Sequence, residues 1–216
     1  GSIREMTAGV DASTKALDST RERVDRLVAM GERLIAVTAA SGLETVDTPF
    51  IRAAQETAAN LSDALEKAVA SGELSLTDLF DDKYVPIQGT NPQQMRTRFV
   101  DTTDRHFPPI QEPMLQLDPR VVFCAAIDRN GYLPTHNTKF SRPQGTDVAW
   151  NTANSRNRRI FADRVGLAAG RSEQAFLVQT YRRDMGGGQY ALMKDVSAPI
   201  RVSGRHWGGL RLAYKI

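Results

Sequence analysis

The 216-residue sequence has one cysteine, few aromatic residues and no long apolar run. The single thiol, Cys124, cannot form an internal disulfide, a zinc–cysteine cluster or a CxxCH haem attachment, and it fits a reducing compartment. No segment approaches the ~18 consecutive apolar residues that a membrane-spanning helix needs, and residues 1–5 show no signal-peptide pattern. Gly1-Ser2 is typical of a cloning scar, which suggests a piece of a longer protein. We expect a cytoplasmic fragment without direct membrane contact.

Signatures of catalysis are also missing. The 3 histidines lack the HxxxH or HExxH spacing of a zinc site. The sequence contains no nucleophile elbow, no dinucleotide-binding fingerprint and no carboxylate pair at helical spacing near a nucleophile. The sequence therefore predicts a protein that is not an enzyme.

What is present is a folded-protein composition with an uneven charge distribution. The chain is 41% apolar and 25% charged, with a net charge of +3. Residues 1–119 carry 12 basic and 19 acidic side chains, whereas residues 120–216 carry 16 and 6. The basic half predicts an anionic partner. Because its arginines are not interleaved with Phe and Tyr, it does not predict a nucleic-acid surface.

The first half is helical. Residues 3–38 repeat apolar side chains every seven residues, which is typical of a parallel coiled coil, although an amphipathic helix of a globular domain has a similar pattern. A second helix begins at Asp47-Thr48-Pro49 and ends at Ser71-Gly72, and we expect it to pack antiparallel to the first. A Pro-rich connector, with a helix near 93–104, then leads to residue 119.

The second half contains strands. Residues 121–127 and 132–136 flank an Asn-Gly turn and predict a hairpin. Residues 150–161 are predicted to be helical. Three further antiparallel strands are expected, at 176–181, 189–196 and 208–214, the first two joined through Gly186-Gly187-Gly188.

These elements predict an α+β fold. A helical hairpin or coiled coil is followed by a five-stranded antiparallel sheet with flanking helices, which resembles the plan of PAS and Cache sensor domains. The expected divisions are a helical segment at 1–71, a connector at 72–119 and a PAS/Cache-like sensor domain at 120–216.

Several segments between residues 72 and 216 carry a more specific resemblance. They are Leu79-Phe80-Asp81-Asp82-Lys83-Tyr84, Pro86-Ile87-Gln88-Gly89-Thr90-Asn91-Pro92, Phe107-Pro108-Pro109-Ile110, Asp128-Arg129-Asn130-Gly131-Tyr132, Gln179-Thr180-Tyr181-Arg182-Arg183 and Gly204-Arg205-His206-Trp207-Gly208. Together they resemble the C-terminal sensory region of a group of bacterial methyl-accepting chemotaxis proteins. The resemblance implies a module that follows the signalling coiled coil, works as a homodimer and reports to the chemotaxis kinase and its adaptor. It does not name a ligand.

Six residues are candidates for binding a small, anionic ligand. On a helix, Arg156 and Arg159 share one face and suit a carboxylate or phosphate, with Trp150 nearby. His136, at the end of a predicted strand, would donate to the ligand or act as the axial ligand of haem b. Alternatively, the arginines pair with Asp147, Asp163 or Asp184, and the histidine is satisfied by a backbone carbonyl.

Tyr181 and Arg183 complete the candidate set. They share one face of a predicted strand, and we assign that face to the cavity. Three functions remain open: a sensor of a small molecule, a haem-binding gas or redox sensor on the same scaffold, and a structural dimerisation module without a ligand.

Overall fold

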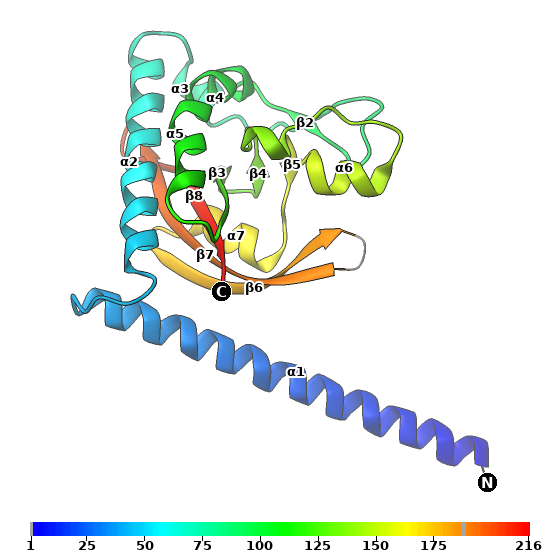
Figure 1. The fold of residues 1–216 in the computed structure, drawn as a ribbon. Coiled ribbons are helices and arrows are strands. Elements are labelled where there is room, and N and C mark those ends of the chain that lie inside the picture. The colour runs from blue at the N-terminus through cyan, green and yellow to red at the C-terminus, as the bar shows by residue number, and fades with distance from the viewer. Residues whose placement is uncertain (1, 187–188) are drawn as a thin grey trace. The chain divides into compact units, whose positions relative to one another are not determined.

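The computed structural model of the chain describes residues 2–186 and 189–216, which form two compact units, Gly1–Glu44 and Thr45–Ile216. The first unit contains the helix α1 (Ser2–Ala40), drawn in blue in Figure 1. The second unit contains the sheets and shorter helices of the described residues. The expected antiparallel packing of the first two helices stays a prediction, because it would join these separate units.

The helix expected over residues 3–38 is confirmed as α1, and its apolar stripe is exposed. The side chains at the two core positions of the seven-residue repeat are more than half exposed; they are Ile3, Met6, Val10, Leu17, Val24, Leu27 and Leu34. Burying such a stripe against a partner helix would be favourable. The coiled coil itself stays a prediction.

The second helix, α2 (Thr48–Ala70), begins and ends where the sequence predicts. Pro49 lies in its first turn, and Ser71 follows its last residue. The helix buries one apolar face, formed by Phe50, Ile51, Ala54, Ala58, Leu61, Leu65 and Ala68. This burial belongs to the core of the second unit.

The connector folds into short elements. They are α3 (Leu76–Leu79), β1 (Val85–Pro86), β2 (Met95–Arg96), α4 (Val100–His106), α5 (Pro108–Gln111) and the 3-10 helix η1 (Glu112–Gln116). The helix expected near 93–104 is wrong in its first half, where β2 pairs with β1. The N–H of Met95 donates to the carbonyl of Arg158 (2.6 Å), so a distant segment holds residue 95 extended.

The main sheet is antiparallel and has four strands in the order β3-β8-β7-β6. The strands are β3 (Val121–Asp128), β6 (Leu177–Gly186), β7 (Gln189–Val202) and β8 (Arg205–Lys215). The four longest predicted strands therefore pair in one sheet. Gly187 and Gly188 of the expected turn lie outside the described residues.

The expected fifth strand and its hairpin are corrected by the structure. β4 (Tyr132–Leu133) pairs with β5 (Arg159–Ile160) in a separate two-stranded sheet and does not pair with β3. Side chains take the place of a fifth strand at the edge of β3. Gln111 Oε1 accepts from the N–H of Ala126 (2.7 Å), and Asn137 Oδ1 accepts from the N–H of Cys124 (2.8 Å).

The helix expected over residues 150–161 is half right. α6 (Val148–Asn154) ends at residue 154, and β5 follows. Arg158 has a positive φ of 60°, and its N–H donates to the carbonyl of Leu133 (2.6 Å). This pairing with β4 ends the helix, so Arg156 and Arg159 do not share a helical face.

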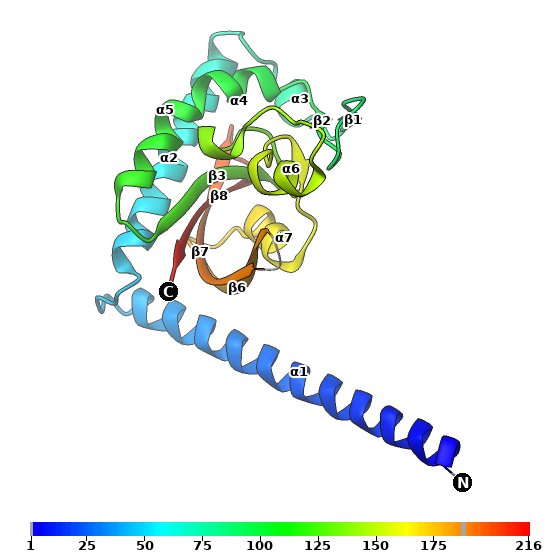
Figure 2. The same ribbon diagram turned by 45° about the vertical axis from the view of Figure 1, so that its right-hand side comes forward.

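Different elements cover the two faces of the main sheet (Figure 2). Lys194 and Tyr214 contact the start of α2, and alternate residues of β7 and β8 share this face. The opposite face carries α7 (Arg164–Arg171) and the segment 132–161, which includes the 3-10 helix η2 (Thr138–Phe140). The second unit therefore has helices on both sides of its sheet.

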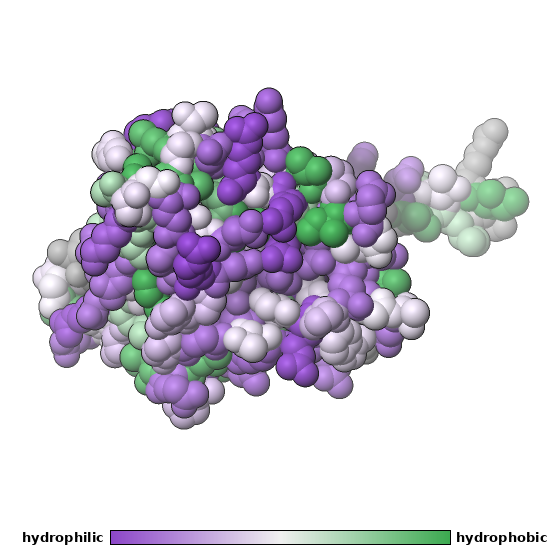
Figure 3. Space-filling model, turned by 90° about the horizontal axis from the view of Figure 1, so that it is seen from above, coloured by the Kyte–Doolittle hydropathy of each residue, from purple (hydrophilic) through white to green (hydrophobic). Residues whose placement is uncertain are grey.

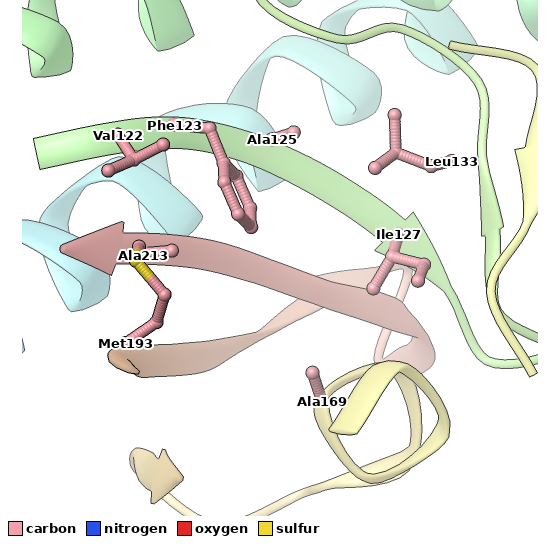
Figure 4. Packing of buried hydrophobic residues seen from close by; sticks show 8 residues of the cluster. All are labelled: Val122, Phe123, Ala125, Ile127, Leu133, Ala169, Met193 and Ala213. Carbon is pink, nitrogen blue, oxygen red and sulfur yellow. The ribbon is translucent and has the colours of Figure 1, made fainter. Parts of the chain in front are cut away.

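A compact apolar cluster lies on this second face. It contains Val122, Phe123, Ala125, Ile127, Leu133, Ala169, Met193 and Ala213. Figure 4 shows Phe123 and Ile127 projecting from β3. By contrast, hydrophilic side chains predominate on the face of the second unit that Figure 3 displays, and hydrophobic ones form small separate groups.

Gly209 allows α7 to lie directly on β8. A Cβ atom at this residue would be 2.3 Å from the carbonyl oxygen of Ala169. We expect Gly209→Ala to destabilise the protein by ~1–3 kcal/mol in urea unfolding, because helix and strand must separate. Gly145→Ala, where a Cβ meets nothing within 4 Å, is the control and should change stability by less than ~0.5 kcal/mol. Equal effects would contradict this explanation.

Candidate functional site

Arg183 is the most unusual side chain on the second face of the sheet. It extends from β6 and is only 6% exposed, whereas the adjacent Arg182 is exposed and lies over the ring of Tyr190. The Arg183 guanidinium lies 4.9 Å from the ring centroids of both Phe123 and Phe140. Its Nε and Nη1 are buried without a hydrogen-bond partner among the described residues. Among the described side chains, this buried cation therefore has no ion-pair partner of its own.

Tyr181 lies on the same side of β6 as Arg183. Cross-strand register places it opposite Met193, a member of the apolar cluster, and its ring packs against that cluster. Burial raises the pKa of the Tyr181 phenol, the nearby Asp195 raises it further, and Arg211, Arg183 and Arg156 lower it. The phenol is therefore neutral at pH 7 and can donate a hydrogen bond.

His136 is buried beside Arg183, at 3% exposure. Its ring lies 5.3 Å from that of Phe123 and 4.9 Å from that of Phe140, the same two rings that flank the guanidinium. Burial lowers the pKa of His136 well below its usual value, and the charges of Arg156, Arg183, Arg211 and Lys139 lower it further. His136 is a neutral donor and acceptor at pH 7.

The segment after α6 contributes two more cations, Arg156 in the loop and Arg159 at the start of β5. The guanidiniums of Arg156 and Arg159 lie 5.0 Å and 5.2 Å from the ring centroid of Phe161, and each Nη1 donates to the carbonyl of Thr152. Burial lowers the pKa of Arg156 to about 9, and the charge of Arg183 adds to this effect. The two arginines therefore converge on one ring, although they do not share a helical face.

The acidic partners that the sequence offered to these arginines are used elsewhere. Asp147 Oδ1 accepts from the N–H of Trp150 and caps α6, and Asp163 Oδ1 caps α7. The side chain of Asp184 lies outside the description. No ion pair of Arg156, Arg159 or Arg183 occurs among the described side chains.

A buried ion pair, which the sequence analysis missed, completes the site. Arg211 of β8 donates from Nε and Nη2 to Asp195 Oδ2 on β7 (2.9 and 2.7 Å). Asp195 Oδ1 and Ser197 Oγ have no hydrogen-bond partner in the described part of the chain. The sequence contains one signal for this ion pair, namely an acidic and a basic residue inside two adjacent apolar strands. We call Arg156, Arg159, Arg183, Arg211, Asp195 and His136 the cationic cluster.

Trp150 is the one candidate that the structure leaves apart. It is 43% exposed on α6, and the ring contacts found among the described residues do not include it. The other five candidates are His136, Arg156, Arg159, Tyr181 and Arg183, and they interact electrostatically as one group. A role for Trp150 in this group therefore has no geometric support.

The residues around His136 do not fit haem. His136 Nδ1 accepts from the N–H of Asn137 (2.7 Å), which places the remaining proton of the neutral ring on Nε2. An axial histidine needs the opposite arrangement, with a free Nε2 lone pair and an Nδ1–H that donates to an acceptor. The described residues also contain no group of three or more His, Cys, Asp or Glu that could hold a metal ion.

Comparison with protein-family models, curated proteins and solved structures found no match to the chain. Among the helices of the described residues, none has both the length and the apolar character required to cross a membrane. The function must therefore be argued from the cationic cluster itself.

Proposed function

We propose that the chain is a sensory region of a bacterial methyl-accepting chemotaxis protein, which binds a small anion at the cationic cluster. The observation that carries this proposal is the buried guanidinium of Arg183, whose Nε and Nη1 have no hydrogen-bond partner among the described residues. Burying a charge without a partner is costly, so a protein that holds one in its folded state gains from an anion that pairs with it.

The composition of the cluster supports an anion more than any other ligand. The cluster contains four guanidiniums and one carboxylate, Asp195, which Arg211 already engages. Arg183 is held on two phenyl rings, and Arg156 and Arg159 on a third, so the donors are fixed in place before a ligand arrives. Fixed arginines are well suited to carboxylate or phosphate groups.

The position of the cluster supports a PAS/Cache-like sensor. The cluster lies between the antiparallel sheet and the segment 132–161, on the face opposite α2. In PAS-like sensors the ligand binds between the sheet and the elements that follow its first strands. We propose this plan for the chain, with four strands in the main sheet in place of five, and we assign sensing to residues 120–216.

Signal output is proposed to run through α1. Its exposed apolar stripe supports association with a second α1 helix, so the sensor would act as a homodimer joined to the receptor's coiled coil. A ligand that binds one packing of the sensor better than another would bias the coil, and through it the chemotaxis kinase and its adaptor. The proposed compartment is the cytoplasm.

Arg183→Met tests the proposal because Met keeps apolar packing while removing the charge. We expect wild-type protein to bind sulfate or succinate in titration calorimetry, and the variant to bind ~10–150-fold more weakly, the loss of a charged hydrogen bond worth ~1.5–3 kcal/mol. Arg182→Met, on the exposed neighbour, should bind like the wild type.

The melting temperatures of the same variants distinguish a binding role of Arg183 from a structural one. Replacing a buried unpaired cation by an apolar residue is expected to leave the melting temperature of ligand-free protein unchanged or raised. A fall in melting temperature with unchanged anion binding would show that Arg183 is structural. Failure of the wild type to bind any of these anions would contradict the proposed function.

A further inference from the structure

The number of unpaired cations in the cluster bears on the charge of its ligand. Arg211 is matched by Asp195, and Lys139 is near Glu112, whose charge favours the protonated amine. Arg156, Arg159 and Arg183 are the three guanidiniums of the cluster for which the described side chains provide no carboxylate. Burial and the charge of Arg183 lower the pKa of Arg156 to about 9, whereas burial is the one cause of the lower pKa of Arg159, so Arg156 and Arg183 are the two cations most in need of a shared counter-charge. Together they call for about two negative charges.

The two arginines approach from opposite sides. Arg183 rises from β6 in the sheet, whereas Arg156 comes from the loop after α6, in the segment that covers the sheet. Each weakens the protonation of its neighbours, since the charge of Arg183 lowers the pKa of Arg156 and both lower that of His136. The N–H of Arg156 also donates to the carbonyl of Phe140 (2.7 Å), and the ring of Phe140 lies 4.9 Å from the Arg183 guanidinium, so both arginines adjoin Phe140 and can act on one small molecule.

Both guanidiniums are held against aromatic rings, Arg183 buried and Arg156 half-buried. Arg183 lies between Phe123 and Phe140, and Arg156 lies over Phe161 and donates to a main-chain carbonyl. A monoanion that paired with one of them would leave the other buried and uncompensated. A dianion would compensate both with one binding event.

We propose that the ligand is a small dianion that bridges Arg156 and Arg183, with His136 as a neutral donor beside it. This inference rests on the proposed function and adds the charge of the ligand to it. A dicarboxylate and a tetrahedral oxyanion such as sulfate or a phosphate monoester share this chemistry. The shape of the dianion is decided by experiment.

The test compares dianions with matched monoanions on the full chain by titration calorimetry at pH 7.5. The pairs are sulfate with methyl sulfate, and succinate with monomethyl succinate. Wild-type protein is expected to bind at least one dianion tenfold or more tightly than its monoanionic partner. Preference for sulfate indicates a tetrahedral oxyanion, and preference for succinate indicates a dicarboxylate.

The preference for a dianion over its matched monoanion should depend on Arg156. In Arg156→Met, affinity for the dianion is expected to fall to within about threefold of that for the monoanion, because the bridge between Arg156 and Arg183 is lost. Arg182→Met should keep the wild-type preference. Arg183→Met provides a second variant with the same expected loss should Arg156→Met fail to fold, as judged by its melting curve.

Three outcomes would overturn the inference, and they differ in whether they also overturn the proposed function. Equal affinity for both members of each pair, with binding still lost in Arg183→Met, would contradict the dianion ligand. The proposed anion sensor would not be contradicted. Absence of binding by all four anions would contradict both the dianion ligand and the proposed anion sensor. Retention of the dianion preference in both Arg156→Met and Arg183→Met would also overturn the bridge.

Discussion

Arg211→Met is expected to destabilise the folded protein by ~3–5 kcal/mol, measured as the free energy of unfolding in urea. The side chain of Asp195 is 0% exposed, and its Oδ2 accepts both hydrogen bonds that Arg211 donates, at 2.9 and 2.7 Å. Removing Arg211 leaves a buried carboxylate whose other oxygen already lacks a partner in the described chain. Breaking a buried pair by removing one member has this cost.

The stability lost in Arg211→Met should increase as pH rises. Burial raises the pKa of Asp195, and Arg211 opposes that rise, so the pKa will rise further in the variant. A carboxyl whose pKa is higher in the folded state takes up a proton on folding. The variant is therefore expected to lose stability as pH rises through the folded-state pKa of Asp195, and to lie closest to the wild type in acid.

A double variant provides the control. Asp195→Asn combined with Arg211→Met removes the buried charge, so most of the lost stability and the added pH dependence should disappear. If Arg211→Met alone were as stable as the wild type from pH 5 to pH 8, the buried pair would not contribute as described.

Local signals in the sequence were enough for the helices and for the long strands. Pro49 and Ser71-Gly72 define the ends of α2, and the seven-residue repeat defines α1. Alternation and length define β6, β7 and β8, which pair along nearly their whole lengths. In each case the pattern and the local chemistry indicate the same element.

Pairing between distant segments was not predictable in the same way. The Asn130-Gly131 turn suggested a hairpin, yet β4 pairs with β5, about 27 residues later, and the edge of β3 is satisfied by Gln111 and Asn137. Side chains that replace a strand leave no periodicity in the sequence. The same long-range pairing ends α6 early and puts Arg156 in a loop and Arg159 in β5.

The site was predictable where one strand set the geometry. Alternation placed Tyr181 and Arg183 on one face of β6, and the structure places both against the second face of the sheet. Trp150 was chosen for its nearness in sequence to Arg156, and the end of α6 separates the two. The sequence analysis does not single out Arg211 or Asp195, which the pairing of β7 with β8 brings together.

Lys194→Met is expected to cost about 3 kcal/mol of folding stability, because it removes the ion pair that ties the start of α2 to the sheet. Lys194 Nζ lies 2.6 Å from Asp47 Oδ2, and the Asp47 side chain is only 4% exposed. The hydroxyl of Tyr214 still donates to Asp47 Oδ1 (2.7 Å), which places the loss at the lower end for a broken buried pair. Urea unfolding measures it.

Arg96→Met provides a matched control, because burial is the main difference between the two pairs. Arg96 and Asp101 are also 2.6 Å apart, but their side chains are 52% and 66% exposed. Water screens such a pair, so its loss should cost less than ~1 kcal/mol. Similar losses in Lys194→Met and Arg96→Met would show that burial of Asp47 does not matter.

The anchor at Lys194 also adjoins the proposed sensor site. Lys194 and Asp195 are consecutive residues of β7, so their side chains lie on opposite faces of the sheet, one on Asp47 and the other on Arg211. An anion in the cationic cluster and the start of α2 would thus act on the same stretch of strand. We expect Lys194→Met to weaken the attachment of α2 while leaving sulfate and succinate affinity within about threefold of the wild type. A larger loss of affinity would show that the anchor and the cluster are energetically coupled across the sheet.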